Sequence, residues 1–245
     1  MAVLNLARSS KILSNQTNVV AILPDEIKIQ AKIPVIWLFH GLGDNGTCWL
    51  RKTSLERIAS KYNVAVIMPD MQRSFYTNTA FNVRYWDYLT QELIPQMQRY
   101  FPLSQKASEN YLVGNSMGGY GALKLAANFP DKFSAVAAIS PVTNLKVVQD
   151  IMPDYQAIFD DYQASQYQLE SMFKKADLTQ LKSLQWYVAT GNDDFMKSDC
   201  DKFTQFLTKD IGLNLTYDEQ PGSHNWDFWD MEIAKIFEWL PLGKI

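Results

Sequence analysis

The amino-acid sequence predicts an α/β fold: a mostly parallel central sheet, helices on both faces of that sheet, and a small helical insertion. Continuous apolar runs, such as residues 34–39 and 64–68, are typical of strands buried on both faces. These runs alternate with helical segments long enough to be the crossovers that parallel strands require. The length of 245 residues fits one large domain, and no repeat or linker marks a boundary within residues 1–245.

The first part of the chain contains the expected edge of the sheet and the first strand and helix pairs. Weak alternation of apolar residues at 3–6 and 18–23 predicts two antiparallel edge strands, joined by a polar turn at 14–17. The apolar run at 34–39 then ends in a Gly-rich loop at 40–46. The elements predicted next are a helix at 54–62, a strand at 64–68, a loop at 71–81 and a helix at 85–100.

The second part of the chain continues the alternation and then interrupts it. A strand at 111–113 and a helix ending near residue 129 lie on either side of a Gly-rich turn. The stretch from about 142 to 183 lacks strand signals, so we expect it to be a helical insertion above the sheet. The remaining predicted elements are helical pieces at 145–152, 155–162 and 168–174, strands at 133–139, 184–190 and 213–218, and helices at 199–211 and 231–240.

Composition and charge exclude several classes of function. The chain is 47% hydrophobic and 20% charged, which is ordinary for a soluble globular enzyme, and its net charge of −3 gives no support for nucleic-acid binding. No apolar run reaches the length of a membrane span, and the first residues do not resemble a secretion signal. We therefore expect a cytoplasmic protein that binds neither nucleic acid nor membrane. Assembly into a homo-oligomer is left open.

The cysteines and histidines argue against metal and redox sites. Cys48 and Cys200 lie far apart in the sequence without metal-ligand spacing, so we expect them to be reduced and incidental. With only two histidines, His40 and His224, a zinc site built on imidazoles is not expected. The sequence thus predicts no metal and no cofactor.

The stretch from residue 110 to residue 125 carries the strongest sign of chemistry. It holds the pattern Gly-x-Ser-x-Gly, formed by Gly114, Ser116 and Gly118, between a short apolar strand and a helix. A serine at a sharp strand-to-helix turn lies in strained backbone, and glycine fits best two residues before and after it. We interpret Ser116 as a nucleophile and the N–H of Met117, at the start of the helix, as an oxyanion donor. The alternative is an ordinary Gly-rich turn, since the five-residue pattern also occurs by chance.

A serine nucleophile needs a base to take its proton and a carboxylate to orient that base. In α/β-hydrolase sheets these groups follow in the order Ser, Asp or Glu, His. Asp193 and Asp194 follow the predicted strand at 184–190, and His224 follows the last strand, at the same sheet edge as Ser116. The alternative for His224 is a hydrogen-bonded loop histidine. Spacing does not choose between the two aspartates, because one acid of such a pair often caps the next helix.

The Gly-rich loop at 40–46 is the candidate for the second oxyanion donor, and we choose the N–H of Leu42. We interpret His40 as a structural residue that orients this loop, without a role in proton transfer. Tyr76, Tyr85 and Trp86 are either pocket walls or core residues. For Trp86, core is the preferred assignment.

Six segments spread over nearly the whole chain carry a family resemblance: residues 38–49 (LFHGLGDNGTCW), 51–57 (RKTSLER), 68–77 (MPDMQRSFYT), 114–124 (GNSMGGYGALK), 191–195 (GNDDF) and 222–226 (GSHNW). With these segments the chain resembles the bacterial tributyrin esterase group of carboxylesterases. That group is related to the S-formylglutathione hydrolases and the mycolyltransferases and has the α/β-hydrolase fold.

The resemblance implies a site as well as a fold. The family's nucleophile, acid and base resemble Ser116, Asp194 and His224, and its oxyanion donors resemble the backbone N–H groups of Leu42 and Met117. The choice of Asp194 over its neighbour follows from this resemblance and not from spacing. The resemblance weakens at residues 144–183, the region that supplies the substrate pocket in such folds, so it does not imply an exact substrate.

The function we expect is a serine carboxylesterase that hydrolyses short-chain acyl esters through an acyl-enzyme on Ser116. The insertion at about 142–183 is rich in polar residues and the chain has no long apolar lid, which favours small acyl groups. One alternative is an acyltransferase with the same triad. Another is an S-formylglutathione hydrolase-like thioesterase, although we expect the thioester to be a poor substrate. A third is a non-catalytic binding module on the same scaffold.

Overall fold

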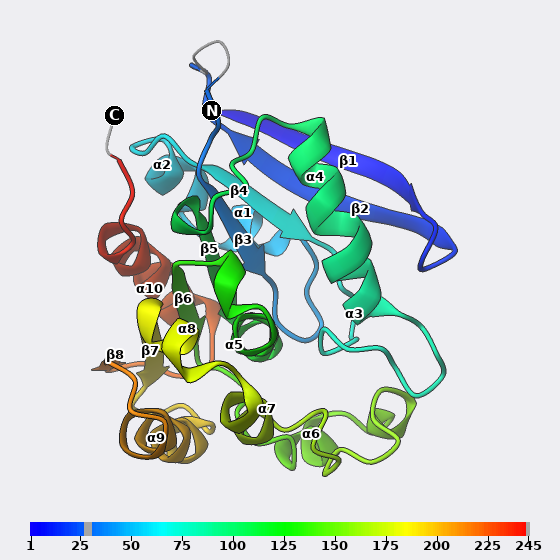
Figure 1. Ribbon diagram of the computed structural model, residues 1–245, viewed down its shortest axis with the longest axis vertical. Coiled ribbons are helices and arrows are strands. Elements are labelled where there is room, and N and C mark those ends of the chain that lie inside the picture. The colour runs from blue at the N-terminus through cyan, green and yellow to red at the C-terminus, as the bar shows by residue number, and fades with distance from the viewer. Residues whose placement is uncertain (27–30, 244–245) are drawn as a thin grey trace.

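The computed structural model describes residues 1–26 and 31–243, and the eight strands within these ranges form one sheet (Figure 1). The strands are β1 (Ala2–Ser10), β2 (Asn15–Leu23), β3 (Val35–Phe39), β4 (Ala65–Pro69), β5 (Asn110–Asn115), β6 (Ala135–Ile139), β7 (Gln185–Gly191) and β8 (Leu215–Gln220). Their order across the sheet is β1-β2-β4-β3-β5-β6-β7-β8. All pairs from β4 to β8 are parallel, whereas β2 is antiparallel to both β1 and β4. The expected mostly parallel sheet is confirmed.

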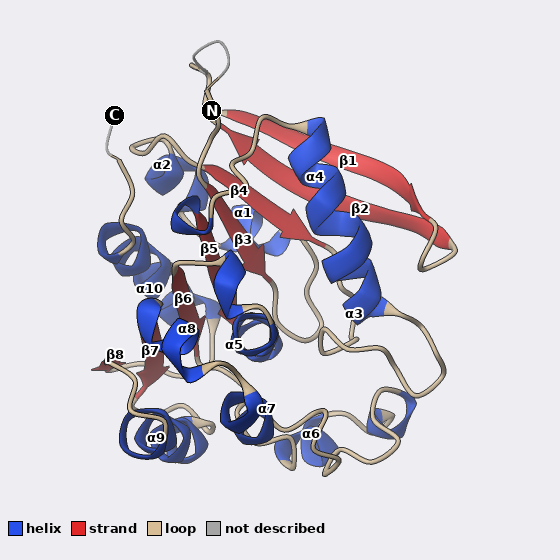
Figure 2. Cartoon of the chain, viewed as in Figure 1, coloured by secondary structure: helices blue, strands red, loops and turns tan. Residues whose placement is uncertain are grey.

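Helices cover both faces of this sheet, as expected (Figure 2). One face packs against α1 (Cys48–Lys52), α2 (Leu55–Ala59) and α10 (Trp226–Trp239). The other face packs against α3 (Tyr85–Asp87), η1 (Tyr88–Leu93), α4 (Ile94–Tyr100), α5 (Met117–Asn128), α6 (Val147–Ile151), α7 (Leu169–Lys175), α8 (Leu178–Ser183), α9 (Lys197–Gln205) and η5 (Phe206–Asp210). Short 3-10 turns are η2 (Ala107–Glu109), η3 (Pro130–Lys132) and η4 (Tyr155–Ala157).

The buried strands supply side chains to both cores because successive residues of a strand point to opposite faces. In β3, Trp37 and Phe39 lie in the core beneath α5, whereas Ile36 and Leu38 lie in the core beneath α1, α2 and α10. This explains why the run at 34–39 is apolar throughout and does not alternate. None of the helices in residues 1–26 and 31–243 has the length and apolar content that a membrane span requires.

Three predicted elements in the first half of the chain have different bounds. The turn expected at 14–17 lies at 11–14, because β1 and β2 stay paired to their ends. The helix expected at 54–62 is the shorter α2, and it is preceded by α1, which the sequence did not predict. The helix expected at 85–100 is a succession of α3, the π-helical segment η1 and α4. Pro95 has no N–H to donate and its ring crowds the preceding turn, which favours the wider π turns before it.

The closing helix begins earlier than the expected 231–240. It starts at Trp226, since the side chain of Asn225 accepts a hydrogen bond from the N–H of Phe228 at 3.1 Å and caps the helix. Phe228 and Trp229 of this first turn are buried together with Ile233 and Ile236, so the apolar face of the helix begins before residue 231. As a result, His224 stands directly before a helix N-cap and not in a long loop.

Residues 142–183 carry α6, α7 and α8 and contact both α5 and the loop after β4. The rings of Phe159 and Phe75 have centroids 5.4 Å apart, and the hydroxyl of Tyr120 donates to the carbonyl oxygen of Tyr167 at 2.8 Å. All four aromatic side chains are buried. The polar composition of this segment therefore describes its outer surface, while its inner surface is apolar.

A buried ion pair ties the edge hairpin to the helices above it. Arg8 of β1 contacts Glu92 of η1 at 2.9 Å, and both side chains are buried. Burial by itself would raise the pKa of Glu92. The N–H of Ile12, the hydroxyl of Ser10 and the charge of Arg8 outweigh it and hold the pKa below its ordinary 4.5. Glu92 thus serves as the anchor for the turn of the hairpin.

Substituting Glu92→Gln is expected to lower the free energy of unfolding at pH 7 by about 3 kcal/mol, because it leaves the buried Arg8 guanidinium without an opposite charge. Since the folded-state pKa of Glu92 is depressed, its contribution is present above pH 4.5 and is lost as the pH falls through the folded-state pKa. Urea unfolding at pH 7 and at pH 4 measures both effects.

The control for this prediction is Asp154→Asn, which removes the half-exposed pair between Asp154 and Arg73. Exposed pairs of this kind contribute about 0–1 kcal/mol. A Glu92→Gln loss no larger than that of the control would show that the hairpin does not depend on this carboxylate.

Candidate active site

Ser116 lies in a sharp turn between β5 and α5, with a φ of 53°. This left-handed conformation is strained for a residue with a Cβ atom. A Cβ on Gly114 would strike the carbonyl oxygen of Gly118, and a Cβ on Gly118 would strike that of Phe39. The N–H of Ser116 donates to the carbonyl oxygen of Ile139 in β6 at 2.9 Å, which holds the turn on the sheet. The two glycines of the motif are therefore steric requirements of the turn.

Three side chains from distant parts of the chain form one hydrogen-bonded row. The hydroxyl of Ser116 is 2.9 Å from Nε2 of His224, and Nδ1 of His224 is 3.0 Å from Oδ2 of Asp194. With its Nδ1 proton directed to the carboxylate, the imidazole presents the Nε2 lone pair to the serine. Ser116 follows β5, Asp194 follows β7 and His224 follows β8, so all three lie at the carboxyl edge of the sheet.

The loops that carry Asp194 and His224 approach each other closely. A Cβ on Gly191 would strike the carbonyl oxygen of Gly222, and the N–H of Asp193 donates to that same oxygen at 2.9 Å. Gly222 has a φ of 152°, a conformation that favours glycine. This backbone contact sets the distance at which the carboxylate meets the imidazole.

The two neighbouring aspartates have different surroundings. Asp194 is buried and accepts the N–H of Met196 at 2.8 Å in addition to its bond with His224, whereas Asp193 is exposed. Burial alone would raise the pKa of Asp194, but the hydrogen bond and charge of His224 and the N–H of Met196 hold it below its ordinary value. The carboxylate therefore stays ionised. Neither aspartate is the N-cap residue of α9, which is Met196, so the helix-cap alternative for one of them is wrong.

The loop after β3 is braced by a buried histidine. The N–H of Met71 donates to Nε2 of His40 at 2.9 Å, and Nδ1 of His40 donates to the carbonyl oxygen of Gly41 at 2.8 Å. Burial lowers the pKa of His40, which keeps the ring neutral and suited to this pattern of one acceptor and one donor. Such an arrangement agrees with a structural role for His40 in holding the loop.

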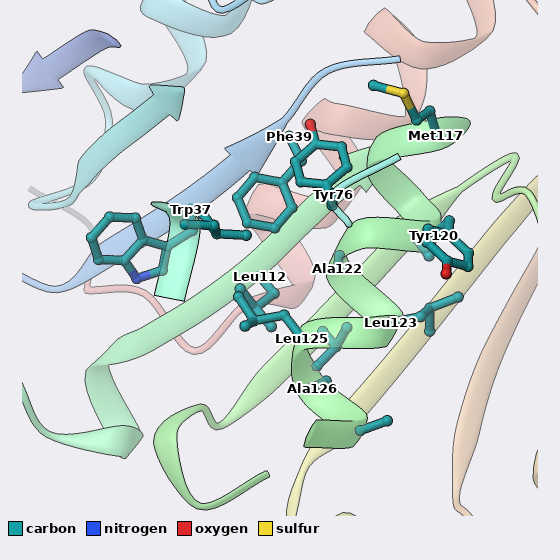
Figure 3. Close-up of a cluster of buried hydrophobic side chains, with 14 of the residues drawn as sticks. Trp37, Phe39, Tyr76, Leu112, Met117, Tyr120, Ala122, Leu123, Leu125 and Ala126 are labelled. Carbon is teal, nitrogen blue, oxygen red and sulfur yellow. The ribbon is translucent and has the colours of Figure 1, made fainter. Parts of the chain in front are cut away.

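Tyr76, whose ring packs against α5, also supports the loop after β3. Its hydroxyl donates to the carbonyl oxygen of His40 at 3.0 Å, and its ring lies 4.8 Å from that of Phe39 (Figure 3). A Cβ on Gly121 of α5 would overlap the Tyr76 ring, so this glycine makes room for it. Tyr76 and Tyr85 are buried core residues, which resolves their assignment.

The two expected oxyanion donors come from segments that meet at Ser116: Met117 follows it directly, and a Cβ on Gly41, the residue before Leu42, would lie 3.4 Å from Cβ of Ser116. The N–H of Met117 is at the first position of α5, where a helix offers no internal acceptor, and Leu42 follows Gly41 in the braced loop. Throughout residues 1–26 and 31–243, no backbone or side-chain acceptor is bonded to either N–H. Both groups are therefore available to an incoming oxygen atom.

Several functional-site neighbours carry no signal in the sequence. Phe195 and Trp229 both pack on the imidazole of His224, with ring centroids 4.7 and 5.1 Å from it. Farther along α5, Lys124 is buried, and its ammonium group donates to the carbonyl oxygen of Tyr76 at 3.0 Å and lies 4.4 Å above the Trp86 ring. Burial lowers the pKa of Lys124 to about 7. Trp86 packs against the core but is partly exposed, so its expected core assignment is correct only in part. Burial and ring contacts of this kind depend on the packing of distant segments. Among the described residues, no three His, Cys, Asp or Glu side chains are grouped so that they could hold a metal ion.

Comparison with known proteins identifies the relatives of this chain. Residues 10–240 match the family model described as "Putative esterase". An acetyl esterase of Caldicellulosiruptor saccharolyticus is 30% identical over 262 aligned residues, which cover 98% of each chain. FphF, a fluorophosphonate-binding serine hydrolase of Staphylococcus aureus, has a TM-score of 0.91 at 28% identity, and the S-formylglutathione hydrolase FrmB of the same organism has 0.89 at 28%. Each of these alignments covers 98% of both chains.

The sheet, the strand-turn-helix at Ser116 and these relatives define a carboxylic ester hydrolase with the α/β-hydrolase fold. The chain belongs to the esterase family whose model it matches over residues 10–240. The resemblance found in the sequence, to esterases related to the S-formylglutathione hydrolases, is confirmed at this level.

Proposed function

We propose that this protein is a serine carboxylesterase in which Ser116 is the nucleophile, His224 the general base and acid, and Asp194 the carboxylate that orients the imidazole. The observation that carries the proposal is the hydrogen-bonded row from Asp194 through His224 to a serine held on a strained turn. A serine hydroxyl is a weak nucleophile at neutral pH, and a neighbouring base that accepts its proton activates it. Loss of ester hydrolysis in a Ser116→Ala variant tests the proposal.

The first half of the reaction forms an acyl-enzyme. Oγ of Ser116 attacks the carbonyl carbon of the ester while its proton moves to Nε2 of His224. Collapse of the tetrahedral intermediate breaks the bond between that carbon and the alcohol oxygen, and the proton passes from Nε2 to the departing oxygen. The charged imidazolium between these transfers is stabilised by the ionised Asp194.

The second half repeats these transfers with water. His224 takes a proton from a water molecule, whose oxygen attacks the acyl carbon, and the proton is then returned to Oγ of Ser116 as the carboxylic acid leaves. In both halves the negative charge develops on the former carbonyl oxygen. The N–H groups of Leu42 and Met117, which have no other acceptor among the described residues, are proposed to bind it.

The substrate class proposed for this site is esters with short acyl chains. Support comes from the similarity to an acetyl esterase over 98% of both chains. It also comes from the insertion at 142–183, whose apolar side chains Phe159 and Tyr167 are already buried against the body of the protein. Side chains used in this way are not available to line a long acyl channel.

A series of p-nitrophenyl esters measures this specificity. We expect kcat/KM to be highest for acetyl to butyryl esters, to fall for octanoyl and longer chains, and to show no increase when the substrate forms micelles. If a pocket received each added methylene, the gain would be about 0.8 kcal/mol, or roughly fourfold in kcat/KM per carbon. A maximum at decanoyl or longer would contradict the proposed class without affecting the triad.

A second candidate activity is hydrolysis of S-formylglutathione, which is favoured by the similarity to the S-formylglutathione hydrolase FrmB. The same triad can attack a thioester, so geometry around Ser116 does not separate the two activities. Comparing kcat/KM for S-formylglutathione with that for an acetyl ester does so, and we expect the ester to be preferred. Product analysis with and without added alcohols separates hydrolysis from acyl transfer.

The cytoplasmic location and the assembly state stay predictions. Cell fractionation tests the expected cytoplasmic location, and light scattering of the purified protein measures whether it forms a homo-oligomer.

A further inference from the structure

Phe195 is a large apolar side chain exposed at the catalytic edge of the sheet. It follows Asp194 directly in the sequence, and 60% of its surface is exposed. Its ring centroid lies 4.7 Å from that of the His224 imidazole, with the two rings inclined at 55°. An exposed phenylalanine loses the free energy that burial would give, so its position beside the imidazole calls for an explanation.

The support of the imidazole does not depend on Phe195. Trp229 contacts the same ring edge to face at 5.1 Å, is itself buried, and donates through its indole N–H toward the hydroxyl of Ser140 at 3.4 Å. Asp194 holds the same ring through a hydrogen bond with Nδ1. The imidazole is therefore already fixed by two buried partners, and Phe195 adds a surface open to solvent.

The proposed mechanism indicates which part of the substrate contacts the exposed surface of Phe195. His224 transfers its proton to the departing oxygen of the ester, so that oxygen must come within hydrogen-bond distance of Nε2. The substituent carried by that oxygen, which is the alcohol part of the substrate, therefore extends beside the imidazole. The exposed ring of Phe195 packs on this same imidazole, so it offers an apolar surface to an alcohol part that extends beside the imidazole.

We propose that Phe195 is the residue that selects the alcohol part of the substrate, and that it favours esters whose alcohol carries an aromatic ring close to the ester oxygen. The proposal rests on the proposed function of Ser116 and His224 and concerns the other side of the ester from the acyl chain. Two aromatic rings pack favourably in offset or edge-to-face arrangements, beyond the simple burial of area. An aromatic alcohol would cover Phe195, whereas a methyl or ethyl group would not reach it.

The test compares two esters that share one acyl group. Ethyl acetate and benzyl acetate form the same acetyl-enzyme and release alcohols of similar acidity, so their kcat/KM values differ only through binding of the alcohol part. In the Phe195→Ala variant we expect kcat/KM for benzyl acetate to fall about tenfold, equivalent to 1.4 kcal/mol. For ethyl acetate we expect it to stay within about twofold of the unmodified protein.

The matched control is Tyr100→Ala. Tyr100 is the last residue of α4 and is 58% exposed, and α4 lies over β1 and β2, across the sheet from β7 and β8 (Figure 1). This variant removes an aromatic side chain of almost equal exposure, and the ratio of the two kcat/KM values should be unchanged. Urea unfolding of both variants checks that each is folded under the assay conditions.

Two results would overturn the proposal. An equal fall for both esters would mean that Phe195 only positions His224, and unchanged kcat/KM values for both esters would mean that the alcohol does not contact Phe195. Neither result would affect the assignment of the triad, which the Ser116→Ala variant tests separately. If the unmodified protein hydrolyses neither ester, the proposed function fails and this inference fails with it.

Discussion

Replacing Ser116 by alanine is expected to lower kcat/KM for ester hydrolysis by a factor of about 10⁴ to 10⁶. The substitution removes only Oγ, the atom that is 2.9 Å from Nε2 of His224, and leaves the Cβ atom that the strained turn already accommodates. The fold and the turn should therefore be retained. The same variant should no longer be labelled by a fluorophosphonate, which reacts with an activated serine hydroxyl.

The measurements are steady-state kinetics on acetyl esters and mass spectrometry after fluorophosphonate treatment. Ser198→Ala is the control, because Ser198 is an exposed serine of α9 and does not contact the triad. The control should keep full activity and label normally. A Ser116→Ala protein that keeps more than a few per cent of the activity would show that another group is the nucleophile.

Replacing Asp194 by asparagine is expected to lower kcat by about 10⁴. The carboxylate accepts the Nδ1 proton of His224 at 3.0 Å, and an amide placed there can donate instead. The imidazole would then carry its proton on Nε2, facing Ser116, and could not accept the serine proton. The variant also loses the negative charge that stabilises the imidazolium during the reaction.

Asp193→Asn makes the same chemical change one residue earlier and is the matched control. Asp193 is exposed and contributes its backbone N–H to the loop contact, a group that asparagine retains. We expect its kcat to stay within about threefold of the unmodified protein. Unfolding curves for both variants show whether either substitution affects stability. Equal, mild losses of kcat would place the catalytic acid elsewhere.

Local patterns in the sequence were sufficient to predict the architecture. Strands buried on both faces appear in the sequence as continuous apolar runs, and the amphipathic segments between them are long enough to be crossover helices. These two patterns predict an α/β sheet with helices on both faces. Ser116 could be singled out because a strained turn demands glycine at fixed positions, a requirement visible in five residues. An aspartate and His224 could then be singled out because they follow Ser116 in the chain order of α/β-hydrolases and come after strands whose ends meet at one sheet edge.

Helix bounds were less well predicted because caps and π turns depend on single contacts. The side chain of Asn225 starts α10 at Trp226, before the predicted start at residue 231, and the turns before Pro95 widen into a π segment. The insertion at 142–183 was judged by its polar composition, but its few apolar side chains are the ones that reach the core. Composition averages over both surfaces of a segment, whereas packing uses only one.

The sequence by itself determined the α/β fold, the strained serine turn and the set of residues that can serve as base and acid, because each of these is written in a local pattern. Spacing left the choice between Asp193 and Asp194 open and the family resemblance favoured Asp194; the tertiary structure shows Asp194 facing His224, since neighbouring residues in a turn point in different directions. The tertiary structure alone decided which contacts make His40 a neutral brace, that Lys124 is buried and that Phe195 lies beside the imidazole. These facts depend on which segments the sheet order brings together, and contacts between distant segments leave no period or spacing in the chain.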